Sequence, residues 1–332
     1  MIISRIVKSD IVYYQLHAEQ AVTATYIDEE GSGIFEEVLT LNTLERIVDD
    51  FKSFPGYNLI LDCQNLKSCQ NNLKKKIKDF KDIAKSVVLT NAQKEIVEKL
   101  DLAIFSNPNN VEDGERFLCF YVSDKDDFAI TNTTLFDDAF KESLIRYSTS
   151  DGEDPIYHES SSVYLSNYIN IKKMISLDKN LFIYAIYKLA IKINEHWFKE
   201  LNIKKPTLIC QNLNSSYVAS ILSGFLKLDV LILDKLGPIN KLYSTLDNKI
   251  KENESYLVVS DVVCLGTEMK IAKNLITFLG GHYLGNVSII RVETLLSETK
   301  KFNDTECVFT ITRENNPTNF QILTALNLVP NE

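Results

Sequence analysis

The stretch that decides the fold of the C-terminal half runs Tyr256-Leu-Val-Val-Ser-Asp-Val-Val-Cys-Leu-Gly-Thr-Glu268. Its apolar start predicts a buried strand that leads to Asp261, and Gly266 with Thr267 opens a predicted helix. A carboxylate at a strand end can accept hydrogen bonds from both hydroxyls of a ribose, and the N–H groups at a helix start suit a phosphate. A plain strand–loop–helix unit, in which Asp261 only caps a turn, would show the same residues.

Similar units lie before and after this stretch. Helices are predicted over 178–199, 215–226 and 266–279. The short apolar runs that predict strands are 207–210, 230–233, 256–260 and 287–290. Strands separated by helices in this way indicate β-α-β crossovers and therefore a parallel sheet in an α/β fold. Ligands of such sheets bind beyond the carboxyl ends of the strands.

Length and charge favour two domains. The chain has 332 residues, and Ser148-Thr-Ser-Asp-Gly-Glu-Asp-Pro155 is the clearest boundary, so we expect domains at 1–150 and 151–332. The net charge is −9, of which residues 1–150 carry −8. An acidic chain lacks the basic surface that is typical of nucleic-acid-binding proteins, so we expect no nucleic-acid partner.

The N-terminal half also alternates predicted strands and helices. Asn42 is expected to cap a first helix, and further helices are predicted over 73–84, 92–100 and 134–147. The predicted strands are 57–62, 86–90 and 117–122. This order indicates a smaller α/β domain. Over residues 1–100 the order resembles a STAS-like domain, and this resemblance implies a regulatory or interaction role with a protein partner. Ser68 lies near that family's phosphorylatable serine, but an ordinary loop serine explains it better.

Other candidate sites have little support. None of the 6 cysteines forms a C-x-x-C pair and the 4 histidines are scattered, so we expect no metal site built by the protein. The acidic turns 28–30 and 124–127 could bind a cation, but surface turns explain them better. His158 and His282 are expected to be structural or exposed. No apolar run has the length of a membrane span, so we expect a cytoplasmic protein without a membrane partner.

Segments in collinear order over residues 156–295 resemble the type I phosphoribosyltransferases, nearest the orotate type. The 256–268 stretch resembles the motif that binds 5-phosphoribosyl 1-pyrophosphate (PRPP). Residues 206–230 resemble the pyrophosphate loop with its helix and next strand, and 231–235 a strand that ends in a lysine. Residues 157–170, with Ser161 and Tyr168, resemble the segment that leads into the hood of the family's fold. Residues 290–293 resemble its D-R-x-E segment.

This resemblance implies a phosphoribosyltransferase-like fold and a role for each matching position. Asp261 would hold the ribose hydroxyls, Gly266 and Thr267 the 5′-phosphate, and Arg291 would face the base pocket. Lys235 would meet the pyrophosphate, and Lys241 would act from a mobile catalytic loop across a homodimer boundary. The pyrophosphate loop would consist of Asn212, Leu213, Asn214, Ser215 and Ser216. Mg²⁺ is implied as the cofactor that holds the leaving group.

Several positions depart from the family pattern. Ser260 replaces the first acid of the pair, and Asp234 replaces the arginine before the lysine. Glu268 stands where the family has a hydroxyl residue, and a carboxylate there would repel a phosphate. Leu265, Asn214, Ser215 and the pair Thr294-Leu295 depart as well. The strands and helices therefore fit the family better than the ligand loops do.

Two functions follow from this combination. The first is a divergent phosphoribosyltransferase-like protein that binds PRPP or a related phosphorylated ribose or nucleotide, with transfer of phosphoribose and release of pyrophosphate. The alternative is a catalytically inactive transferase fold that serves as a ligand sensor or as an interaction or effector module, for example in a bacterial defence system.

Overall fold

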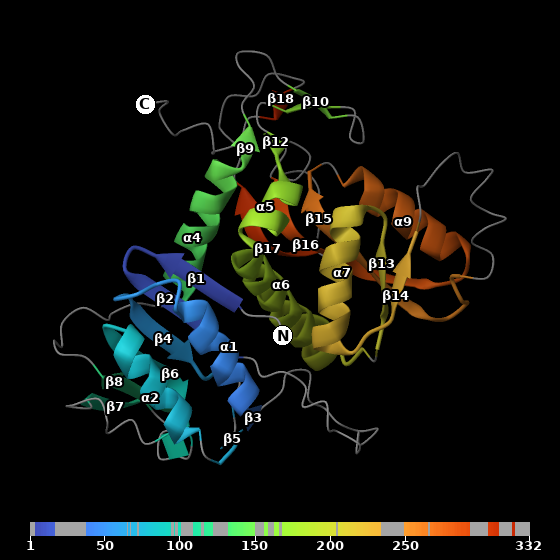
Figure 1. Ribbon diagram of the computed structural model, residues 1–332. Helices are drawn as coiled ribbons and strands as arrows, with labels where there is room; N and C mark the ends of the chain where they lie inside the picture. Colours follow the sequence, from blue (N-terminus) through green and yellow to red (C-terminus); the bar gives the residue numbers. More distant parts are fainter. Residues whose placement is uncertain are drawn as a thin grey trace. The chain divides into compact units, whose positions relative to one another are not determined.

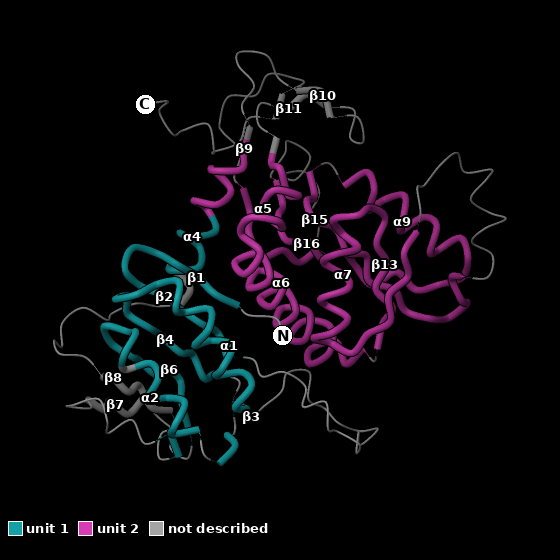
Figure 2. Tube along the Cα trace, in the orientation of Figure 1, with its two compact units in different colours: residues 1–140 teal, residues 141–332 magenta. Residues whose placement is uncertain are grey.

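The computed structural model describes residues 4–16, 38–64, 66, 68–71, 73–93, 96, 99–100, 109–113, 116–121, 132–149, 156–158, 163–165, 168–203, 205–233, 249–264, 266–292, 305–311 and 321–322. It separates into two compact units, residues 1–140 and 141–332 (Figure 2). The division falls within helix α4 (Asn132–Arg146), ahead of the polar stretch at 148–155.

Unit 1 contains a six-stranded mixed sheet in the order β1-β2-β4-β6-β8-β7. Its strands are β1 (Ser4–Lys8), β2 (Ile11–Gln15), β4 (Asn58–Asp62), β6 (Ser86–Ala92), β8 (Arg116–Tyr121) and β7 (Asn109–Asp113). The three central strands β2, β4 and β6 are parallel, and the outer pairs are antiparallel. A separate short pair joins β3 (Val38–Leu39) to β5 (Ser68–Cys69). The predicted α/β class is confirmed, whereas the STAS-like character stays a prediction.

Helices α1 (Leu41–Phe51) and α2 (Lys74–Ile83) cover one face of this sheet through an apolar core. The buried stripe of α1 contains Leu44, Ile47, Val48 and Phe51, as helical spacing requires. The expectation that Asn42 caps this helix is wrong. Thr40 is the cap, because its backbone is extended and its hydroxyl accepts a hydrogen bond from Thr43 N at 3.2 Å.

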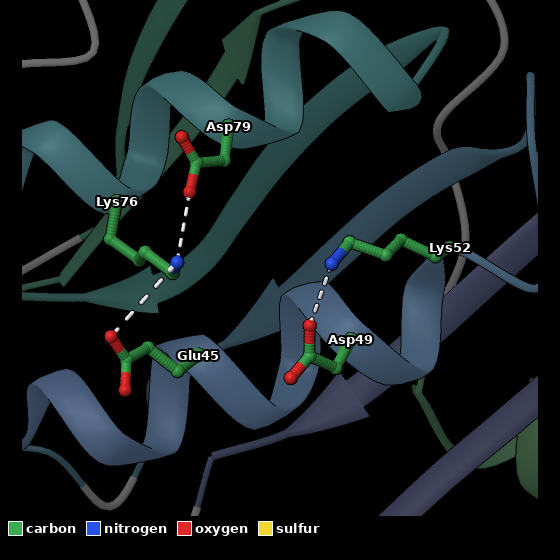
Figure 3. Close-up of polar contacts among 5 residues, drawn as sticks. All are labelled: Glu45, Asp49, Lys52, Lys76 and Asp79. Carbon is green, nitrogen blue, oxygen red and sulfur yellow. Dashed lines mark hydrogen bonds and ion pairs between the residues drawn. The ribbon is translucent and has the colours of Figure 1, made fainter.

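The outer surfaces of α1 and α2 carry ion pairs (Figure 3). Lys76 Nζ lies 3.0 Å from Asp79 and 4.0 Å from Glu45, and Lys52 Nζ lies 2.8 Å from Asp49. Exposed pairs of this kind contribute about 1 kcal/mol or less. The apolar core therefore holds these helices together.

Unit 2 contains a five-stranded parallel sheet in the order β14-β13-β15-β16-β17 (Figure 1). Its strands are β14 (Val230–Ile232), β13 (Thr207–Cys210), β15 (Ser255–Val263), β16 (His282–Val292) and β17 (Thr305–Ile311). The parallel sheet predicted for the C-terminal half is confirmed, and β17 extends it beyond the predicted strands. Short strands make two further sheets, β12 (Tyr168–Ile169) with β9 (Ser148–Thr149), and β10 (Ile156–His158), β11 (Val163–Leu165) and β18 (Gln321–Ile322).

The helices of unit 2 cover both faces of its parallel sheet. They are α5 (Ile171–Leu177), α6 (Lys179–Ile193), α7 (Leu213–Leu226) and α9 (Thr267–Phe278), and α6 continues as a π-helical segment, Asn194–Glu200. Helix α6 packs on β16 and β17 and beside α7, which packs on β13 and β15. Tyr256 and Val258 of β15 pack against α9 instead. Side chains alternate between the faces of a strand, so Asp261 belongs to the opposite face, toward α7.

Helix α6 is buried around most of its circumference, including Phe182, Tyr184 and Tyr187. These aromatic side chains form core packing, and a helix that is apolar on most sides belongs largely in an interior. Among the helices that the structure describes, none is long and apolar enough to cross a membrane.

Candidate functional site

The order of the strands marks one position at the carboxyl edge of the unit 2 sheet. Strand β14, which follows β13 in the chain, pairs with one edge of β13. The next strand, β15, pairs with the other edge, and β16 and β17 continue outward from β15. Helices α7 and α9, which follow β13 and β15, pack on opposite faces. Open α/β sheets bind ligands at such a switch point. The residues at the starts of α7 and α9 are therefore the candidates for a site.

The start of α7 is closed by a capping box. Asn212 Oδ1 accepts a hydrogen bond from Ser215 N at 2.8 Å. The buried Ser215 Oγ accepts in return from Asn212 N at 3.1 Å and from Gln211 N at 3.3 Å. Three main-chain donors that a pyrophosphate loop could present to an anion are thus already bonded within the loop. Ser216 Oγ donates to the backbone oxygen of Asn212 at 2.8 Å.

Asp261 meets the first turn of α7. Asn214 Nδ2 donates to Asp261 Oδ2 at 2.9 Å, and both side chains are partly exposed. The structure therefore brings together two of the residues predicted from separate motifs. Strand β15 continues to Val263, so Asp261 lies within the strand, two residues before its end, rather than in the loop that follows.

Glu268 lies in the first turn of α9 and faces the same place. Its partly buried carboxylate is bonded to the side chain of Asn212, and Gln211 Nε2 donates to its backbone oxygen at 3.1 Å. Burial and the charge of Asp261 raise the pKa of Glu268, and the hydrogen bond with Asn212 opposes that rise. Two carboxylates and the amides of Asn212 and Asn214 thus lie close together.

Gly266 precedes α9 in the left-handed region, with φ of 68°, which a glycine adopts without strain. Its backbone oxygen accepts the first helical hydrogen bond, from Lys270 N at 3.0 Å. Thr267 is exposed. Burial raises the pKa of Cys264, in the loop before the helix, to about 12, so its thiol is not a ready nucleophile.

Ser260, which stands where the family has the first acid of the pair, faces away from Asp261. It is buried on the face of β15 opposite Asp261, and its hydroxyl donates to Asn286 Oδ1 at 3.1 Å. Asn286 Nδ2 and Ser288 Oγ have no hydrogen-bond partner among the residues described. This cluster was not predicted from the sequence. Its signal is the presence of the polar residues Asn286 and Ser288 within the apolar strand around 286–290.

Arg291 stands next to Val263 on the neighbouring strand, near the same sheet edge. Its guanidinium Nε is buried and has no hydrogen-bond partner in the part of the chain that the structure covers. Lys235, Lys241, Ser161, Leu265 and Asp234 lie outside the described residues, as do 28–30, 124–127 and 294–295. The backbone of Tyr168 lies in β12.

The donors at the site suit Mg²⁺ only in part. The carboxylates of Asp261 and Glu268 are hard oxygen ligands of the kind that Mg²⁺ takes, and Asp261 Oδ2 is already bonded to Asn214. Over the described ranges, no group of three or more histidine, cysteine, aspartate or glutamate side chains could hold a metal ion. A metal would therefore need oxygen atoms of the ligand as well.

No family model matches the chain. A segment of 97 residues is 34% identical to the pentafunctional AROM polypeptide of Kluyveromyces lactis, and this match covers 29% of the chain and only 6% of the relative's length. Solved structures are similar to about half of the chain or less. The orotate phosphoribosyltransferase of Aeropyrum pernix is 15% identical, with a TM-score of 0.39, covering 52% of this chain and 93% of its own.

Two purine enzymes are similar as well. The adenine phosphoribosyltransferase of Thermoanaerobacter pseudethanolicus is 16% identical, with a TM-score of 0.35, covering 43% of this chain and 88% of its own. The HGPRT-ase of Leishmania tarentolae is 17% identical, with a TM-score of 0.30, covering 41% of this chain and 79% of its own. These solved structures are phosphoribosyltransferases, the family whose motifs the C-terminal half of this sequence resembles.

Proposed function

We propose that the C-terminal unit binds a ribose-containing small molecule, PRPP or a related nucleotide-like compound, at the carboxyl ends of β13 and β15. The observation that carries this proposal is the hydrogen bond between Asn214 Nδ2 and Asp261 Oδ2, 2.9 Å long, at the switch point of the sheet. A carboxylate and an amide held together at this point can bond the two hydroxyls of a ribose.

Transfer chemistry is the finer part of this proposal. The bond from the anomeric carbon to pyrophosphate would break, and a bond to an acceptor base would form at the same carbon. Asp261 would orient the ribose, Arg291 would face the base, and Lys235 and Lys241 would meet the leaving pyrophosphate, the latter across a homodimer. Mg²⁺, held by Asp261 and by ligand oxygens, would neutralise the charge of that group.

Binding without turnover is the second candidate, and the capping box of α7 favours it. The main-chain donors of Gln211, Asn212 and Ser215 are bonded to the side chains of Ser215 and Asn212 rather than open to a pyrophosphate. A protein of this kind would act as a ligand sensor. The N-terminal unit would then pass the signal to a protein partner.

Calorimetry and a pyrophosphate-release assay on the full chain separate these candidates. We expect saturable binding of at least one ribose compound from a set of PRPP with Mg²⁺, nucleotides and nucleosides. D261A should weaken that binding by tenfold or more, whereas D229A, an exposed aspartate before β14, should not change it. Release of pyrophosphate with an acceptor base supports transfer; binding alone supports the sensor. No binding by any compound contradicts the proposal.

A further inference from the structure

We infer that Glu268 determines the class of ligand: the site accepts a ribose compound whose 5′ position is uncharged, of the nucleoside type, and rejects its 5′-phosphate. This inference rests on the proposed ribose site and on the second candidate function, binding without transfer, because PRPP itself carries a 5′-phosphate. It concerns a specificity-determining residue, and it follows from the two helix starts that meet at the site and from the charges placed there.

The start of α9 is the first place where a phosphate would bind. A phosphate at a helix start needs the N–H groups of the first turn together with the positive end of the helix. Glu268 stands in that first turn, and Asn212 bonds its carboxylate from across the site. An anionic side chain already complements the positive helix end, so a second anion meets repulsion there.

The start of α7 is less suited to a phosphate, because three of its main-chain donors are already bonded. The N–H groups of Gln211 and Asn212 donate to Ser215 Oγ, and Ser215 N donates to Asn212 Oδ1. Leu213 N and Asn214 N lie outside the box, so a phosphate that uses all the donors of this turn could bind only after the capping box had opened. Capping hydrogen bonds of this kind stabilise a helix measurably, so opening the box opposes binding.

The charge of the site also disfavours a phosphate. The negative charge of Asp261 contributes to the raised pKa of Glu268. Among the residues described, no cation contributes to that shift. Arg291 is a cation near the same sheet edge, beside Val263, so the two carboxylates of Asp261 and Glu268 outnumber it by one charge. Hydroxyl groups suit these carboxylates, because a 5′-hydroxyl can donate to Glu268 while the ribose hydroxyls meet Asp261 and Asn214.

Matched pairs of ligands test the inference. Adenosine with AMP, guanosine with GMP, and uridine with UMP are titrated into the full chain by calorimetry at pH 8 without divalent cations. For a pair that binds, we expect the nucleoside to bind at least tenfold more tightly than its monophosphate. E268Q keeps the shape of the side chain and should reduce that ratio by about tenfold.

Two variants serve as controls. E254Q makes the same change at an exposed glutamate before the amino end of β15, and it should leave the ratio unchanged. D261N should weaken both members of a pair together. Circular dichroism confirms that each variant is folded.

The possible failures are distinguishable. Equal binding of both members, or a ratio that E268Q does not change, overturns the role of Glu268 while the ribose site remains. Tighter binding of the monophosphate to the unmodified protein once Mg²⁺ is added, or saturable binding of PRPP with Mg²⁺, also overturns it, because the site would then hold a 5′-phosphate. Binding of neither member of any pair, with PRPP and Mg²⁺ also failing, overturns the proposed ribose site itself.

Discussion

Each of the two units places an aspartate at the carboxyl end of a central parallel strand, and the two carboxyl groups have different surroundings. Asp62 ends β4 and is fully buried. Tyr13 OH, Asn91 Nδ2 at 3.0 Å and Gln64 N at 2.8 Å donate to it. Asp261 is partly exposed, and its bond to Asn214 joins two elements at a switch point. The same residue at the same place in a sheet can therefore be structural or available to a ligand.

What separates the two aspartates is the supply of donors from other segments. Residues 13 and 91 lie on the strands that flank β4, so the sheet itself satisfies Asp62. In unit 2 the residues next to Asp261 include a second acid, Glu268. The first arrangement stabilises a fold, and the second leaves a charge for a ligand to satisfy.

The largest effect is expected from D62A. Removing this buried carboxyl group takes the acceptor away from Gln64 N and from the half-buried Asn91 Nδ2, and it leaves Tyr13 OH with only Gln15 Oε1, at 3.1 Å, among the acceptors described, so the free energy of unfolding should fall by about 4 kcal/mol. D261A should change it by less than about 1 kcal/mol, because Asp261 is partly exposed. Urea denaturation followed by circular dichroism measures both. Equal losses for the two variants would contradict the comparison.

S260D tests the two faces of β15. A carboxylate at this buried position should cost about 3 kcal/mol, since Asn286 is the only polar side chain bonded to Ser260 in the described structure. The fluorescence of Trp197, the single tryptophan, reports unfolding of unit 2. The added acid should also fail to increase the affinity for the ribose compound that binds, because it faces away from Asp261. A tighter complex with that compound would show that residue 260 belongs to the site.

N212A tests whether Asn212 both caps α7 and holds Glu268. Loss of this cap should lower the stability of unit 2 by about 1 kcal/mol and weaken nucleoside binding, because Glu268 loses its partner. N170A is the matched control, since Asn170 caps α5 in the same way. It should cost a similar free energy without any effect on binding. A binding defect in both variants would indicate a general loss of structure.

The smallest effect concerns pH. A raised pKa means that the folded chain holds the proton of Glu268 more tightly than the unfolded chain does. The resulting stabilisation is present below the ordinary pKa of glutamate, about 4.3, and disappears as the pH rises through the raised value. E268Q should therefore melt slightly above the unmodified protein at pH 8 and lose this advantage at pH 4. An advantage that grows toward acid pH would show the opposite sign.

Much of unit 2 could be predicted from its sequence, because short apolar runs and helical spacing determine a parallel sheet. Gly266 and the start of α9 followed from the same pattern. The partners of the polar side chains could not be predicted. The contact of Asn212 with Glu268 joins segments more than fifty residues apart, and only the sheet order brings them together. Ser260 and Asp261 are neighbours in the sequence, but a strand turns neighbouring side chains to opposite faces, so only Asp261 faces α7.

The buried pair of Ser260 and Asn286 has a consequence for how β15 and β16 align. Val258 stands beside Asn286 and Ser260 beside Ser288, so the pair bonds diagonally between the two strands. A slip of one residue would turn Asn286 toward the other face and separate it from Ser260. The buried amide therefore fixes the register of the two strands. It determines the level at which Asp261 and Arg291 stand along the sheet edge, and so the spacing that any ligand spanning them would have to match.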